Sequence, residues 1–118
     1  MLNSSDGVTW GQLPITPTAG NNALSGVAWS GTQFVAVGGY IVTPSGAQTS
    51  GTTNFLRGVV WSGTQFVAVG DVGTILTSPD GITWTLQASG TTNTLSGVVW
   101  SGTQFVIVGE NGTILTSP

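Results

Sequence analysis

Leu95-Ser-Gly-Val-Val-Trp-Ser-Gly-Thr-Gln-Phe-Val-Ile-Val-Gly-Glu-Asn-Gly-Thr-Ile-Leu-Thr-Ser-Pro118 is the stretch that decides the fold, because residues 56–79 carry nearly the same 24 residues. The two copies are identical at 20 of 24 positions and differ only at Arg57/Ser96, Ala68/Ile107, Asp71/Glu110 and Val72/Asn111. A third, shortened copy begins at Leu24. Self-similarity of this kind predicts a repeat architecture, in which each copy is one structural unit.

Each copy predicts three short strands separated by tight turns. In the last copy the strands are expected at 97–100, 104–108 and 113–116, with glycine-containing turns between them. These strands are apolar on both faces, as the run Phe66-Val-Ala-Val69 illustrates. Strands of this kind are packed between two other layers of structure, so we expect the repeated units to stack face to face.

A fourth strand is expected within the full blade, residues 55–88, after its three repeated strands. The dipeptide Asp80-Gly81 between β-forming residues predicts a two-residue type I′ hairpin, in which both central residues have positive φ. After the turn, the apolar residues Ile82, Trp84 and Leu86 alternate with polar ones, which is typical of a half-exposed edge strand. The same phrase near the start of the chain predicts a turn at Asp6 and Gly7 and a strand over residues 8–13.

The complete unit is therefore a four-stranded antiparallel meander that repeats after 39 residues, from Trp61 to Trp100. This is the length and strand number of a β-propeller blade. The chain is expected to form one propeller-repeat domain over 1–118: an outer strand over 1–13, a shortened blade over 24–50 whose fourth strand is short, irregular or absent, a full blade over 55–88 and a blade without its outer strand over 94–118. A β-trefoil, which also has three repeats of four strands, is the alternative fold; its barrel strands would alternate apolar and polar residues.

The order of these strands predicts assembly of identical chains. Residues 1–13 supply an outer strand without a blade, while residues 94–118 supply a blade without an outer strand. Closed propellers have 4–8 blades, and one chain supplies about three. We expect the outer strand of one chain to complete the last blade of another, so that two chains give six blades and three chains give nine. The six-bladed dimer is the favoured arrangement.

Composition excludes several classes of function. The chain has one cationic residue, Arg57, four acidic residues and a formal net charge of −3, which argues against nucleic acid and anionic membranes as partners. Without Cys or His, it cannot form disulfides or build a serine or cysteine catalytic triad. No enzyme activity, metal or cofactor is expected. Residues 1–5 lack the features of a signal peptide and no apolar run is long enough for a membrane helix, so localisation stays undetermined.

The residues Ser78, Asp80, Gly81 and Trp84, which recur in the same order near the start of the chain, resemble a known motif. They are similar to the Asp-box repeats of sialidase-like propellers and to the related repeats of photosystem II assembly factor-like propellers. The resemblance implies a propeller fold, with the motif at the turn between the third and fourth strands of a blade. It also implies that sialidase activity needs an arginine cluster and a tyrosine nucleophile, whereas this chain has one Arg and one Tyr.

Two functional hypotheses follow from the sequence. The first is a non-enzymatic, self-assembling scaffold or interaction module, either natural or an engineered or reconstructed fragment. The second is a multivalent lectin that stacks neutral sugars on aromatic side chains. The residues expected to build structural turns are Asp6, Gly7, Asp80 and Gly81, and those expected to face a ligand in the second hypothesis are Trp10, Trp84, Asn54 and Asn93.

Overall fold

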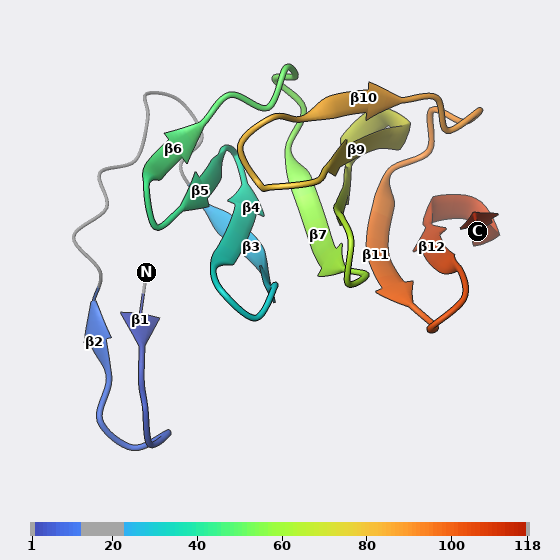
Figure 1. The fold of residues 1–118 in the computed structure, drawn as a ribbon. Coiled ribbons are helices and arrows are strands. Elements are labelled where there is room, and N and C mark those ends of the chain that lie inside the picture. Colours follow the sequence, from blue (N-terminus) through green and yellow to red (C-terminus); the bar gives the residue numbers. More distant parts are fainter. Residues whose placement is uncertain (1, 13–22, 118) are drawn as a thin grey trace.

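The computed structural model of the chain describes residues 2–12 and 23–117 and is built from short antiparallel strands (Figure 1). No α-helix occurs within these two ranges. Two short 3-10 turns, η1 (Asp71–Gly73) and η2 (Glu110–Gly112), connect strands. The strands are β1 (Leu2–Asn3), β2 (Gly11–Gln12), β3 (Leu24–Trp29), β4 (Phe34–Gly38), β5 (Ile41–Thr43), β6 (Gly46–Gln48), β7 (Leu56–Trp61), β8 (Phe66–Gly70), β9 (Thr74–Ser78), β10 (Thr85–Gln87), β11 (Leu95–Trp100), β12 (Phe105–Gly109) and β13 (Ile114–Ser117).

The strands form three meanders and a separate hairpin. The first sheet has the order β3-β4-β5-β6, the second β10-β9-β8-β7 and the third β11-β12-β13, while β1 and β2 make the N-terminal hairpin. The predicted all-β class and antiparallel meander are confirmed, and the shortened copy has a fourth strand, the three-residue β6. The described strands form separate sheets and do not close into the barrel that the trefoil alternative requires.

The three sheets share one register because they share one sequence. Leu24, Leu56 and Leu95 lie opposite a glycine at the end of the second strand of their sheets, and each pairing is followed by a register shift. Gly70 shows why glycine is needed there, because a Cβ atom at this position would overlap the carbonyl oxygen of Phe55. That carbonyl accepts a hydrogen bond from the Asp71 amide at 2.9 Å, so the close approach fixes the chain before β7 against the end of β8.

The core lies between the sheets in two clusters. One cluster joins the first sheet to the second; its fully buried members are Val35, Val37, Ile41, Leu56, Phe66, Ala68 and Leu76. The other joins the second sheet to the third; its buried members are Val67, Val69, Leu95, Phe105 and Ile107. The second sheet is therefore covered on both faces, as its two-sided apolar strands predict. Burial of each large apolar side chain contributes about 1.5–3 kcal/mol, so these two junctions stabilise the stack.

Both junctions use the same two surfaces. We call the face of each sheet that carries the tryptophan at the end of its first strand (Trp29, Trp61 or Trp100) the Trp face, and the opposite face the Val face. At each junction the Val face of one sheet packs on the Trp face of the next sheet. The first strands come closest, since a Cβ at Gly26 would lie 3.3 Å from the Gly58 Cα. In Figure 1 the sheets follow one another in chain order from the first to the third.

The two 3-10 turns provide a matched test of this packing. Gly73 and Gly112 occupy equivalent positions with φ of 66° and 69°, so alanine at either position incurs about 1–2 kcal/mol of left-handed strain. A Cβ at Gly73 would also overlap the Thr91 carbonyl oxygen, whereas a Cβ at Gly112 meets nothing within 4 Å. We expect Gly73→Ala to lower the free energy of unfolding by about 1–3 kcal/mol more than Gly112→Ala, measured by urea denaturation. Equal losses would contradict the packing of the 89–91 loop on η1.

Candidate functional site

The turn between β9 and β10 is stabilised by side chains. The Asp80 Oδ1 accepts hydrogen bonds from the amides of Ile82 at 2.8 Å and Thr83 at 3.0 Å, and the Ser78 Oγ accepts one from Gly81 at 2.7 Å. Only Gly81 has a positive φ, of 81°, so the predicted two-residue type I′ hairpin is wrong. The Asp and Ser oxygens bind amides two and three residues ahead, and this gives a longer turn in place of the short one.

The N-terminal hairpin contains the same turn. The Asp6 Oδ1 accepts hydrogen bonds from the amides of Val8 and Thr9, both at 2.8 Å, and Gly7 has φ of 75°. The strands that follow these turns are shorter than predicted. They begin at Thr85 and Gly11, so Trp84 and Trp10 belong to the turns and not to the strands. The predicted strand over residues 8–13 is reduced to β2, and Leu13 lies outside the described residues.

The hydrogen bonds of this turn have an electrostatic consequence. The amides of Thr83 and Ile82 stabilise the Asp80 carboxylate and hold its pKa below the usual value of 3.8. The amides of Thr9 and Val8 lower the pKa of Asp6 in the same way. Because the folded pKa of Asp80 is depressed, the stability that it contributes is present above the unfolded value of 3.8 and is lost as pH falls through the lower folded value.

We therefore expect Asp80→Asn to flatten the dependence of stability on pH below pH 3.8. The amide keeps the oxygen acceptor but does not titrate, so the variant is less stable than the original chain near neutral pH and loses less on acidification. Urea denaturation at a series of pH values measures this. At protein concentrations too low for assembly, Asp6→Asn is the control, since the N-terminal hairpin does not belong to either core cluster and its turn should leave the unfolding of the sheets unchanged. Parallel pH curves for Asp80→Asn and the original chain would contradict the expectation.

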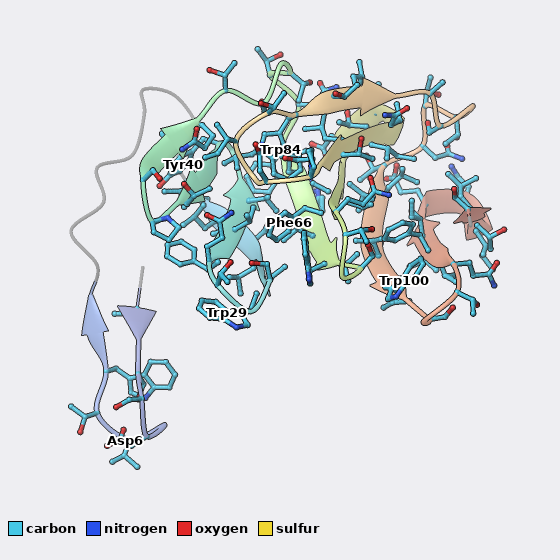
Figure 2. The ribbon with its side chains drawn as sticks, viewed as in Figure 1. Asp6, Trp29, Tyr40, Phe66, Trp84 and Trp100 are labelled. Atoms are coloured by element: carbon cyan, nitrogen blue, oxygen red, sulfur yellow. The ribbon has the colours of Figure 1, made fainter. Side chains whose placement is uncertain are left out.

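The turn that contains Trp84 contacts the first sheet. The Trp84 Nε1 donates a hydrogen bond to the Gly81 carbonyl at 2.8 Å, and its ring lies 6.3 Å from that of Phe66 in the second sheet. Figure 2 labels both rings. Trp84 packs against the cluster between the first and second sheets, where Gly81 is buried. The Gln33 Nε2 of the first sheet donates a hydrogen bond to the Asp80 carbonyl. The turn is therefore part of the junction between two sheets.

The equivalent turn of the N-terminal hairpin is exposed. Trp10 is 58% exposed, and Asp6 and Gly7 are exposed as well. Figures 1 and 2 place this hairpin, with Asp6 at its tip, beside the first sheet and on the opposite side of the molecule from β11 and β12. The hairpin thus carries the same side chains as the turn of the second sheet, without the packing that covers them there.

Asn54 and Asn93 occupy equivalent loops and bind within their own sheets. Their Nδ2 atoms donate hydrogen bonds to the Oγ1 atoms of Thr74 and Thr113, both at 2.9 Å. No described contact joins either asparagine to Trp10 or Trp84. The role of these four residues in sugar binding stays a prediction. The amides of Asn54 and Asn93 are used in hydrogen bonds that hold their own loops.

The charged residues do not form a metal-binding cluster in the described part of the chain. The Arg57 Nε lies 2.7 Å from the Asp71 Oδ1 within the second sheet, and the guanidinium lies 5.1 Å from the centre of the Phe55 ring. No group of three or more Asp, Glu, His or Cys side chains in the described ranges could hold a metal ion. None of the helical segments in those ranges has the length and apolar character needed to cross a membrane.

The outer part of the junction between the second and third sheets forms an open groove of about 610 Å³. We call it the outer groove and define it by the lining residues Gln65, Val67, Phe105, Ile107, Leu115 and Thr116. The equivalent positions at the first junction are Gln33, Val35, Phe66, Ala68, Leu76 and Thr77, and there the Trp84 turn covers them. Gln65 and Val67 were not among the predicted site residues, although the repeated Gln-Phe-Val at 33–35, 65–67 and 104–106 marks them.

Comparisons of the chain with protein-family models, with curated proteins and with solved structures found no match. The groove, the two outer faces of the stack and the exposed hairpin are therefore the features from which a function can be argued.

Proposed function

We propose that the chain is a non-enzymatic β-propeller scaffold that assembles from identical copies. This proposal is supported by the absence of His, Lys and Cys, which are common acid-base groups and nucleophiles of enzymes, and by the ion pair that Arg57 makes within its own sheet. The side chains that remain exposed are suited to packing rather than to chemistry.

One observation carries this proposal: the two outer faces of the stack match each other. The first sheet exposes part of its Trp face: Val27 and Trp29 are each 61% exposed, whereas Ala36 and Val42 on the same face are buried. The third sheet exposes its Val face, with Val99 at 57% and Ile114 at 67%. These are the two kinds of face that pack together at both junctions inside the chain. Contiguous exposed apolar surfaces mark interaction sites, and here the partner with the matching kind of face is another copy.

Assembly of this kind is head to tail, because different faces of the two copies meet. Such contacts close into a ring when the rotation per unit divides a full turn. Two copies would give six blades and three would give nine, and six lies within the usual range of closed propellers. Closure would also remove the exposed sheet faces, which are otherwise a risk for uncontrolled association.

The lectin hypothesis lacks a comparable observation. Trp84 packs against a core cluster, and Asn54 and Asn93 are bound to threonines of their own sheets. Sugar binding by these residues would need an additional surface that the described contacts do not supply.

The test is the mass of the purified chain in solution, measured by light scattering over a range of concentrations. We expect twice the chain mass of 11.9 kDa for the six-bladed assembly. Three times that mass would change the number of blades but keep the proposal, and an 11.9 kDa species at all concentrations would overturn it. A glycan array run in parallel would test the lectin hypothesis independently of the mass measurement.

A further inference from the structure

We propose that the outer groove receives the N-terminal hairpin of a second copy, with Trp10 as the anchoring side chain. This inference rests on the proposed assembly. The hairpin, the outer groove and Trp10 would then complete the contact between two copies. The chain itself supplies the precedent, because the second sheet already contains a copy of the same segment packed in the same kind of groove.

The hairpin matches the outer part of the second sheet in register as well as in sequence. In the second sheet, Leu76 pairs with Leu86 and Thr77 with Thr85. In the hairpin, Leu2 pairs with Gln12 and Asn3 with Gly11. Aligned on their Asp-Gly turns, these are the same two pairs. The turn, the tryptophan and the first residues of the following strand are thus preformed in a shape that the second sheet uses for packing.

The filled groove at the first junction defines what the hairpin would contact. There the buried Gly81 lies against Val35, Gln33 donates a hydrogen bond to the Asp80 carbonyl, and the Trp84 ring lies beside Phe66. At the second junction the matching groups are Val67, Gln65 and Phe105, all of which line the outer groove. The side chain of Gln65 makes no hydrogen bond among the described residues, whereas its counterpart Gln33 binds the turn.

The outer edges of the second and third sheets also correspond. β9 is followed at its outer edge by β10, whereas β13 is the edge strand of the third sheet. By the register of the second sheet, β2 of the incoming hairpin would place Gly11 opposite Thr116 and Gln12 opposite Leu115. An added strand satisfies the backbone groups along an open edge, and the apolar anchor in the groove supplies specificity.

This docking requires the hairpin to exchange partners. Leu115 and Thr116 correspond to Leu2 and Asn3, which pair with β2 within the hairpin. Since the equivalent register uses the same edge of β2, β13 of the receiving copy and β1 of the incoming copy compete for that edge. Residues 2 and 3 are therefore a built-in competitor of assembly, and their removal should strengthen docking.

Cysteine cross-linking tests the register. The chain has no Cys, so Gly11→Cys with Thr116→Cys introduces the only two thiols. Residues directly opposite in antiparallel strands have Cα atoms about 4.5–5.5 Å apart, which is within the range for a disulfide. We expect oxidation to give a covalent product between chains on a non-reducing gel. The control Gly11→Cys with Thr77→Cys should not cross-link, because Thr77 is already paired with Thr85. Absence of the product, or a link within one chain, would overturn the inference.

The anchor is tested by Trp10→Ala. We expect this substitution to raise the dissociation constant for assembly at least about 30-fold. An effect of this size is typical of a buried tryptophan at the centre of an interface. The control is Val8→Ala on the same hairpin, since its counterpart Ile82 stays 42% exposed in the packed turn. We expect Val8→Ala to change the constant less than about threefold. Deletion of residues 2 and 3 should lower the dissociation constant, because it removes the competing strand and keeps the Ser4 hydrogen bonds of the turn. Equal effects of the two alanine variants would exclude Trp10 as the anchor.

The outcomes separate this inference from the proposed function. A monomeric original chain overturns both. An assembled chain that gives no cross-link between Gly11→Cys and Thr116→Cys, and that tolerates Trp10→Ala, keeps the scaffold and removes the hairpin from the groove. In that case the two outer faces alone would hold the copies together.

Discussion

Replacing Phe66 by alanine is expected to lower the free energy of unfolding by about 3–5 kcal/mol. Phe66 is fully buried, and its ring lies 4.6 Å from that of Trp61 and 6.3 Å from that of Trp84. Removing it leaves a cavity where the second sheet meets the first, and also removes the partner that positions the Trp84 turn. Urea denaturation followed by tryptophan fluorescence measures the loss.

The repeat supplies two controls at equivalent positions. Phe105 is 5% exposed and packs on Trp100 at 4.6 Å, but the third sheet has no packed counterpart of Trp84 among its described residues. Phe34 lies half-buried on the open Trp face of the first sheet. At low protein concentration we expect the loss to decrease in the order Phe66, Phe105, Phe34. Equal losses at the three positions would show that the junctions between sheets do not determine stability.

The strands could be predicted because their signal is local. The run Phe66-Val-Ala-Val69 is apolar on both faces, and only a strand between two layers buries both faces. The run recurs at Phe34, and at Phe105 with isoleucine in place of alanine, and this repetition predicted the stacking of the sheets. The fourth strand of the shortened copy could not be predicted with certainty, because the missing residues fall between β4 and β5 and after β5; it is formed as β6, with the same three-residue length as β10 of the full copy.

The turn and the groove could not be predicted in the same way. The preference of Asp-Gly for type I′ turns concerns φ alone, while at Asp80 the carboxylate bound two amides and set a longer turn. Asn54 was expected to face a ligand, but sequence does not tell whether a polar loop side chain turns outward or binds its own loop. The outer groove needs Gln65 of one sheet beside Phe105 of the next, a contact that depends on how the sheets stack.

Opposite charges on the two outer faces are expected to prevent assembly separately and to restore it together. Trp29→Lys places a cation on the Trp face of the first sheet, and Val99→Glu places an anion on the Val face of the third. Both side chains are more than half exposed, so neither substitution should unfold the chain. In a closed two-copy ring, each variant alone has two junctions with an unpaired charge, which costs several kcal/mol at each buried junction.

Mixing the two variants removes the unpaired charges, provided that the ring closes head to tail. One junction of the mixed ring has no substitution, and the other places the lysine of one variant near the glutamate of the other as an opposite-charge pair, which is far less costly than a lone buried charge. We expect light scattering to give a monomer for each variant and a two-chain species for the equimolar mixture. If the copies instead met through identical faces, one variant would assemble alone and the other would not recover on mixing. The mixture therefore distinguishes a ring closed by unlike faces from a simple two-fold contact, because only unlike faces allow each defect to be paired with the other.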